Sequence, residues 1–130
     1  MTIKEFITNQ SDLICGKRCS LIKIEKAEQA LGLEFSDEFK EYLMSFSVAM
    51  FNGHEFTGIS KNDRINVVSA TKNEWNNSPM VMHDLYVIEQ LNIDGIVIWQ
   101  DNRGNVYQSS FNTKPEKIFD SLLDYLESLI

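Results

Sequence analysis

The segment Ile96–Tyr107, which reads IVIWQDNRGNVY, concentrates side chains that could bind an ion or a phosphate. A calcium loop needs oxygen ligands at alternating positions, and Arg103 stands at the third position of a loop starting at Asp101. A phosphate loop needs several glycines and a lysine before a helix, whereas an apolar β-type run follows here. Asp at the first position and Gly at the fourth fit a type I turn, so Asp101–Gly104 is predicted to close a β-hairpin. This exposed polar turn, with Asn102 at its tip, could still contact a partner.

The other candidates for chemistry do not form a catalytic or metal-binding motif. Cys15 and Cys19 form a C-x-x-x-C pair, and the two histidines, His54 and His83, have no ligand partner at a spacing typical of zinc sites. No nucleophile motif such as G-x-S-x-G is present. Adjacent carboxylates on an exposed helix diverge and stay ionised, whereas catalytic carboxylates need burial or a close partner. The sequence therefore predicts a protein that is not an enzyme and needs neither metal nor cofactor.

Charge is distributed unevenly along the 130 residues, whose formal net charge is −7. Residues 1–24 carry +2, so residues 25–130 carry −9. An acidic surface repels phosphate backbones, which argues against direct nucleic-acid binding, and it attracts a basic partner. No apolar run reaches the ~20 residues of a membrane span, and the stretch MTIKEFITNQ does not resemble a signal peptide. We therefore expect a cytoplasmic protein without membrane contact.

Apolar periodicity predicts three helices in the first part of the chain. Their ranges are 2–14, 23–31 and a third helix that begins after Ser36, a good N-cap residue. Gly32 is a natural stop for the second helix. The third helix has the clearest amphipathic pattern, formed by Phe39, Tyr42, Leu43 and Phe46.

After residue 47 the apolar period changes to that of strands. The predicted strands are 48–51, 55–59, 65–69, 85–89, 93–100 and 105–109. Thr71 and Glu74 form a capping box for a short helix 72–77, and residues 117–129 form a closing helix. Ile96–Trp99 does not alternate, so we expect it to be covered on both faces. The order predicts one α+β domain over residues 1–130, with N-terminal and C-terminal helices packed around a twisted, mostly antiparallel β-sheet.

The segment IEKAEQALGLEFSDEFKEYLMSFS resembles the signature region of the SUKH superfamily, which is named partly for yeast cell-wall-assembly regulators. The matching residues are Glu28, Leu31, Gly32, Leu33, Phe35, Glu38, Phe39, Lys40, Tyr42 and Leu43. Looser similarity in VVSATKNEW, DLYVIEQLNIDGIVIWQDNRGNVYQ and IFDSLLDYLESLI extends the resemblance over residues 20–130. Ser36 replaces the family's proline, and residues 47–50 replace its Gly-Gly pair.

The resemblance implies a SUKH-like fold and a function. Most bacterial members look like immunity proteins that bind and neutralise a cognate toxin domain, often a nuclease, without catalysis or a cofactor. An acidic protein can occupy the basic cleft of such a toxin. The alternatives are a regulatory or scaffold protein related to the cell-wall-assembly regulators, and a small-ligand-binding domain. The partner-binding residues that we predict are Glu34, Asp37, Glu38, Glu41, Trp75, Asp101, Asn102 and Arg103.

Overall fold

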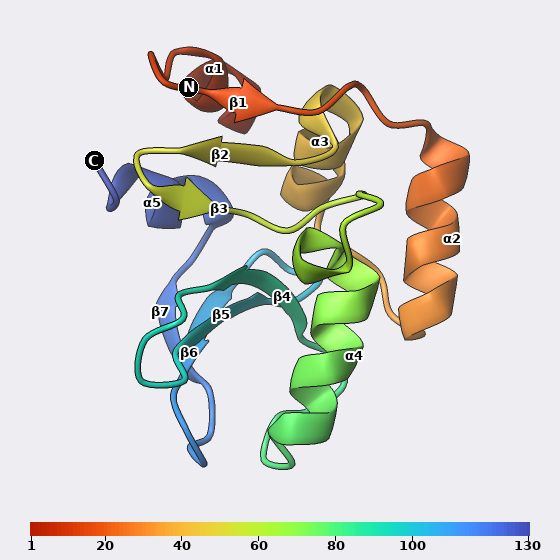
Figure 1. The fold of residues 1–130 in the computed structure, drawn as a ribbon, viewed down its shortest axis with the longest axis vertical. Coiled ribbons are helices and arrows are strands. Elements are labelled where there is room, and N and C mark those ends of the chain that lie inside the picture. Colours follow the sequence, from red (N-terminus) through yellow and green to blue (C-terminus); the bar gives the residue numbers. More distant parts are fainter.

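A computed structural model describes residues 1–130 and contains helices and strands in an interleaved order (Figure 1). The helices are α1 (Ile3–Thr8), α2 (Leu21–Leu31), α3 (Asp37–Phe46), the 3-10 helix η1 (Asp63–Ile65), α4 (Val67–Asn77) and α5 (Leu122–Glu127). The strands are β1 (Ile14–Cys15), β2 (Ala49–Phe51), β3 (His54–Glu55), β4 (Tyr86–Gln90), β5 (Val97–Gln100), β6 (Val106–Ser109) and β7 (Glu116–Phe119).

The strands form two antiparallel sheets, which confirms the predicted α+β class. β1, β2 and β3 form the smaller sheet, and β4 to β7 form the larger one, each in chain order. Just after β3 the Thr57 amide donates to the Ile88 carbonyl over 2.8 Å, and the Thr57 hydroxyl donates to the Val87 carbonyl over 2.6 Å. These two bonds anchor the smaller sheet to β4.

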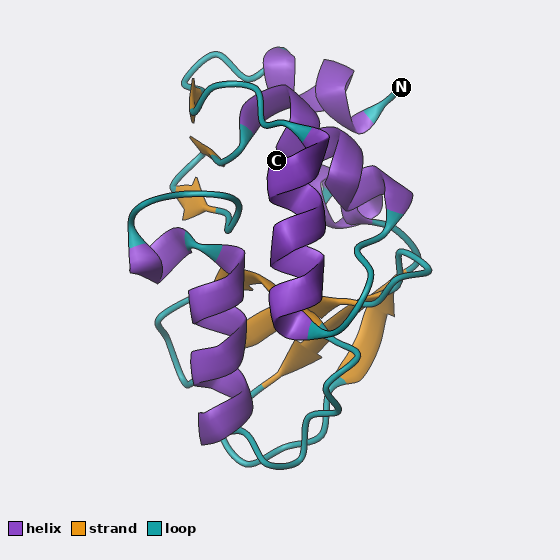
Figure 2. Ribbon diagram, turned by 90° about the vertical axis from the view of Figure 1, so that its right-hand side faces the viewer, coloured by secondary structure: helices purple, strands orange, loops and turns teal.

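Apolar side chains cover both faces of the larger sheet. Ile88 and Ile98 point into the main core with α1, α3 and α5, whereas Val97 and Trp99 pack in a second cluster with Ala70 of α4. All four residues of β5 are buried. This confirms the expectation of cover on both faces for Val97–Trp99, whereas Ile96 is half-buried and the predicted strand 93–100 begins only at Val97. Figure 2 shows α2 and α4 side by side in front of the sheet.

Gly32 ends the second helix and Ser36 caps the third, as predicted, whereas α2 begins at Leu21, two residues before the predicted start at residue 23. The Ser20 hydroxyl caps α2, and Gly32 ends it in a left-handed conformation with φ of 69°. The Ser36 hydroxyl accepts from the Phe39 amide over 3.0 Å and caps α3. The apolar stripe of α3 is buried as predicted, because every member lies on the face turned to the sheet: Phe39, Tyr42, Leu43 and Phe46.

The first predicted helix is too long. The observed helix α1 ends at Thr8, not at residue 14. Ile14 lies in β1, where it pairs with Met50, and its side chain is 64% exposed. The reason lies in Gly16, whose amide donates to the Val48 carbonyl over 2.9 Å. A Cβ on Gly16 would lie 2.9 Å from the Phe46 carbonyl oxygen, so the glycine lets this segment pass close to the end of α3.

Three further elements in the middle of the chain differ from the prediction: the strand 65–69, the start of the helix 72–77 and the strand 55–59. Residues 65–69 are not a strand, because Asn66 caps α4 by accepting from the Val68 and Ser69 amides. Thr71 is therefore no cap: it is buried inside α4, and its hydroxyl accepts from the Val87 amide over 3.0 Å. The predicted strand 55–59 shrinks to His54–Glu55, because the chain turns there from β2 toward β4.

The predicted closing helix 117–129 divides into a strand and a short helix. β7 pairs with β6, and Ser121 then caps α5 by accepting from the Asp124 amide. Leu122, Tyr125 and Leu126 of α5 are buried in the core, whereas Ile130 is 69% exposed. The hydrogen-bonding edge of β6 thus overrides the helical spacing of this segment.

Candidate partner-binding face at the start of helix α3

The predicted turn between β5 and β6 is present and internally bonded. The Gly104 amide donates to the Asp101 carbonyl over 3.1 Å, and Gly104 has φ of 95°. The Asp101 carboxylate accepts from the Arg103 and Asn105 amides, the Asn105 side chain and the Tyr107 hydroxyl, at 2.9–3.1 Å. Burial acts to raise the pKa of Asp101, but these hydrogen bonds outweigh it and lower the pKa. Asp101 thus orders the turn, whereas Asn102 and Arg103 are exposed.

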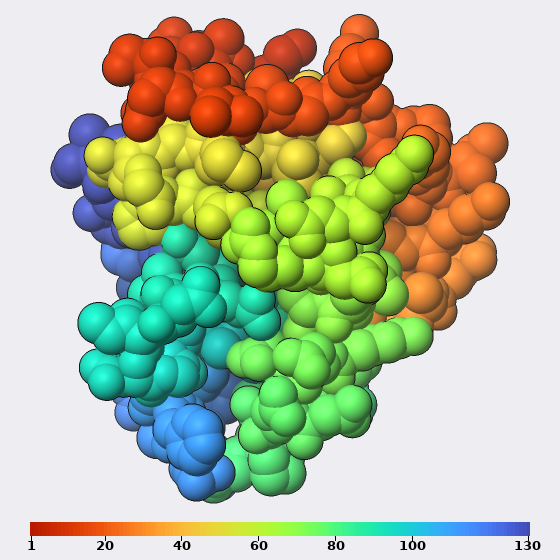
Figure 3. All heavy atoms as spheres, viewed as in Figure 1, coloured from red at the N-terminus to blue at the C-terminus, as the bar shows by residue number.

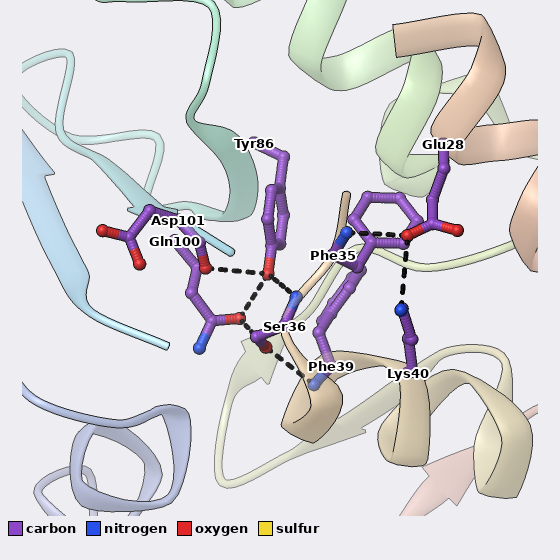
Figure 4. Close-up of polar contacts among 8 residues, drawn as sticks. All are labelled: Glu28, Phe35, Ser36, Phe39, Lys40, Tyr86, Gln100 and Asp101. Carbon is purple, nitrogen blue, oxygen red and sulfur yellow. Dashed lines mark hydrogen bonds and ion pairs between the residues drawn. The ribbon is translucent and has the colours of Figure 1, made fainter. Parts of the chain in front are cut away.

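Gln100, the last residue of β5, connects this turn to the start of α3 (Figure 4). Its side chain is fully buried. Oε1 accepts from the Ser36 hydroxyl over 3.0 Å and from the Tyr86 hydroxyl over 2.8 Å. Nε2 donates to the Gly104 carbonyl over 3.1 Å and to Glu38 Oε1 over 3.2 Å. Every hydrogen-bonding position of the amide is therefore used, and the turn is tied to α3.

Glu38 extends the same network to α5. Its Oε1 accepts from the Leu122 amide over 2.6 Å, and its Oε2 accepts from the Leu123 amide over 2.9 Å. These amides belong to the first turn of α5, where a carboxylate also interacts favourably with the helix dipole. Glu38 is half-buried, so the expectation that it is an exposed acid is wrong: its position is fixed inside the protein.

Three segments that are distant in the sequence therefore meet around Gln100 and Glu38. We name their exposed surface the junction face. Its members are Asp37, Glu41, Asn102, Arg103, Asp120 and Asp124, all of them exposed. Asp120 also pairs with Lys117 over 2.6 Å, which offsets one of the charges. The carboxylates nevertheless outnumber the cations, so the face is acidic.

The connection before α3 is fixed by Glu28. Its Oε2 accepts from the Phe35 amide over 2.9 Å and lies 3.7 Å from the Lys40 ammonium (Figure 4). Glu34, in the same connection, is exposed and lines a shallow groove together with Glu25 and Glu28. Glu34 thus lies with the acids of α2 and is not a member of the junction face.

Trp75 is separate from the junction face. It lies on α4 and packs against both apolar clusters, at a distance in the fold from the segments that form that face. Its indole N–H donates to the Leu85 carbonyl over 3.0 Å, and its ring stacks on His83 with the centroids 4.2 Å apart. The side chain is half-buried, so the structure gives it contacts within the fold.

A buried carboxylate that the sequence analysis did not single out lies at the other end of β4. Glu89 is 3% exposed. Its Oε2 lies 2.7 Å from His54 Nδ1, and its Oε1 accepts from the Tyr125 hydroxyl over 2.6 Å. Burial raises the pKa of Glu89, and the bonds from Tyr125 and His54 oppose that rise. A β-bulge between Val87 and Glu89 turns this side chain toward α5, which strict alternation along the strand would not predict.

The fold is a SUKH-like α+β domain in which buried polar contacts join α3, the β5–β6 turn and α5. A family model confirms the class: SUKH_5, described as SMI1-KNR4 cell-wall, matches residues 2–130, and the chain belongs to this family. No curated protein sequence matches the chain. Among the helices, none has the length and apolar character that crossing a membrane requires. No group of three or more His, Cys, Asp or Glu side chains is placed to hold a metal ion.

Proposed function

We propose that this protein is an immunity protein that binds a cognate toxin domain through its junction face and neutralises it. The observation that carries the proposal is the gathering of exposed acids from α3 and α5 around one ordered turn. Membership of the SUKH family supports an immunity-type or SMI1/KNR4-like role in general. The protein acts by contact, without a catalytic step of its own.

The partner that fits this face is a basic protein domain, and a nuclease is the natural case. A nuclease must hold phosphate groups, so its active cleft is electropositive. Asp37 and Glu41 are neighbours one helical turn apart on α3, and Asp124 follows the amides that Glu38 holds. Such an arrangement can occupy the cleft in place of the substrate and accelerates association by steering.

The internal bonding of the junction face also favours tight binding. Ordering a mobile loop on association costs free energy, about 0.5–1.5 kcal/mol for each immobilised side chain. Here Asp101 and Gln100 order the turn, and Glu38 holds the start of α5, before any partner arrives. The face therefore binds as a preformed surface.

The experiment is co-expression with the C-terminal domain of any exported protein that is encoded next to this one, followed by binding measurements on purified proteins. The test variant is Asp37→Lys with Glu41→Lys. The control is Glu5→Lys with Glu116→Lys, which changes the net charge equally at exposed positions on α1 and at the start of β7. Glu38 is left intact, because changing it disturbs α5.

We expect the unmodified protein to protect cells and the test variant to associate about tenfold or more slowly at low salt, with a smaller deficit at high salt. The control should stay close to the unmodified protein. Equal losses in both variants would show that only net charge matters, and the junction face would then be rejected. A toxin left active by the unmodified protein would remove the immunity function itself.

A regulatory or scaffold function is the second candidate, and the description of the matching family, which refers to the cell wall, favours it. It also requires a partner-binding surface, so the same variants apply. The two functions are distinguished by the growth of cells that express the partner alone. A toxin domain stops growth, whereas the partner of a scaffold protein does not.

A further inference from the structure

A pocket of about 260 Å³ lies between three segments: the β2–β3 hairpin, η1 and the end of β4 with the loop after it. Figure 3 shows these segments meeting on one face of the molecule, in yellow, yellow-green and teal. Ligand pockets for drug-sized molecules measure roughly 300–1,000 Å³, so this volume suits a single side chain. Its polar lining includes His54, Glu55, Arg64 and Glu89.

The buried wall of the pocket carries a carboxylate with unused acceptor capacity. Glu89 receives one hydrogen bond at each oxygen, from His54 and from Tyr125. An ionised carboxylate can accept about four hydrogen bonds. Because Glu89 lines the pocket, a donor that enters can use the remaining capacity.

The rim of the pocket already holds a guanidinium group. Arg64 Nη1 and Nη2 donate to the two oxygens of Glu55 over 3.2 Å and 2.8 Å. This hydrogen bonding, with the charge of Arg64, lowers the pKa of Glu55, so the pair stays ionised. Arg64 thus neutralises Glu55, and Glu89, which lies beside His54, is the remaining carboxylate of the lining. In its ionised form Glu89 favours an entering group that is cationic.

Apolar side chains complete the lining and discriminate between cations. Ile65, Leu91 and Ile93 line the pocket beside the polar groups. The methylene stem of a long basic side chain packs against such residues while its head reaches the carboxylate. A guanidinium has five donors in a planar fork and is more weakly hydrated than an ammonium, so it enters a partly buried site at lower cost.

We propose that this pocket binds the guanidinium group of an arginine side chain on the partner protein, with Glu89 as its counter-charge. The inference rests on the proposed function, because it assigns a contact to the partner. It adds a second contact that is separate from the junction face and is built by β3, η1 and β4.

The first test needs no toxin. The ¹⁵N-labelled protein is titrated with N-acetyl-arginine amide and, as a matched neutral probe of the same shape, with the N-acetyl amide of citrulline. We expect saturable amide shifts confined to Gly53, His54 and Leu91–Ile93 with the arginine probe alone, at millimolar dissociation constants. Equal shifts with both probes, or no saturable shift, overturn the inference.

Two variants decide the role of charge. Glu89→Gln should weaken binding of the arginine probe about tenfold, because a charge-assisted contact is lost. Arg64→Ala should strengthen it, because Glu55 then adds its charge; this exposed change leaves the core intact. A weaker affinity for Arg64→Ala would contradict the proposal, even if Glu89→Gln did not fold. Glu116→Gln serves as the control and should leave the affinity unchanged.

The toxin complex separates this inference from the proposed function. Weaker toxin binding by Glu89→Gln together with tighter toxin binding by Arg64→Ala supports the pocket contact, because a mere displacement of α5 by Glu89→Gln would leave Arg64→Ala unchanged. Equal binding by Glu89→Gln and the unmodified protein overturns the pocket contact and leaves the immunity function standing. A toxin that the unmodified protein does not bind overturns the proposed function, and the probe titration then decides on the guanidinium pocket alone.

Discussion

Replacing Gln100 by alanine should destabilise the protein strongly, because this one side chain closes four buried hydrogen bonds. The Ser36 hydroxyl loses its acceptor, and the Gly104 carbonyl loses its donor. The Tyr86 hydroxyl keeps a weaker acceptor, the Asp101 carbonyl at 3.4 Å. Two buried polar groups are thus left unsatisfied: the Ser36 O–H, whose oxygen still accepts from the Phe39 amide, and the Gly104 carbonyl.

The expected loss of unfolding free energy follows from this count. A buried polar group without a partner costs about 1–3 kcal/mol, so two such groups cost about 2–6 kcal/mol. Truncation also leaves a small cavity at a fully buried position, whereas Tyr86 recovers part of its bonding. We therefore expect Gln100→Ala to lose about 3–5 kcal/mol. Gln100→Leu fills the volume but leaves the same groups unpaired, so it should recover only the cavity contribution.

Urea unfolding, followed by circular dichroism, measures these losses from the midpoints at a common m-value. Gln108→Ala is the control: it removes an exposed glutamine from the neighbouring strand β6 and should change stability by less than about 0.5 kcal/mol. A loss below about 1 kcal/mol for Gln100→Ala would refute the reasoning. Full stability in Gln100→Leu would show that packing, and not hydrogen bonding, holds the junction.

Three further changes test other parts of the structure. Gly58→Ala should lower the free energy of unfolding by more than about 3 kcal/mol, because its Cβ would lie 1.7 Å from the Ser47 carbonyl oxygen. Gly32→Ala has open space around the new Cβ and should cost only about 1 kcal/mol. Urea unfolding measures both losses, and similar values would contradict the close packing at Gly58. Glu38→Gln should lose about 1–2 kcal/mol and speed hydrogen exchange of the first amides of α5; unchanged exchange would remove its capping role. Because the folded protein raises the pKa of Glu89 above the ordinary 4.5, the stability of the unmodified protein relative to Glu89→Gln should fall as the pH rises above about 4.5, and level off once the folded carboxyl has ionised. Urea unfolding of both proteins at a series of pH values measures this difference in the free energy of unfolding. A stability advantage of the unmodified protein that grows with pH would contradict the prediction.

The elements that the sequence predicts well are specified by short-range signals. Ser36 caps α3 and Gly32 ends α2, and each signal acts within one turn of its own helix. The Asp101–Gly104 turn is likewise a local device, closed by a bond from residue 104 to residue 101. Where the capping residues, the turn residues and the apolar spacing of a segment favour the same structure, that structure can be predicted without the rest of the fold.

The mispredicted elements depend on partners that are distant in the sequence. Residues 116–119 have the spacing of a helix but pair with β6, and Ile14 leaves a helical pattern to pair with Met50. Thr71 fits a capping box in the sequence, yet it lies inside α4, where its hydroxyl accepts a hydrogen bond from the Val87 amide of β4. In each case a strand edge supplies hydrogen bonds that local propensity does not contain.

The same limit applies to the site residues. Asp37, Glu38 and Glu41 look equivalent in the sequence, and only Glu38 meets the two amides at the start of α5, more than 80 positions away. Glu89 ends an apolar run and gives one usable signal, an acid at the end of a predicted strand. The bulge that turns it toward Tyr125 has no marker in the sequence.

The position of α5 follows from the two buried polar clusters together. This helix has 6 residues, too few to be stable alone, so packing and hydrogen bonding must hold it. Glu38 fixes its first turn, and Glu89 holds Tyr125 near its end. Asp124 lies between these two contacts and belongs to the junction face. Loosening either contact therefore displaces an acid that the proposed partner meets, even though Glu38 is half-buried and Glu89 lies outside the face.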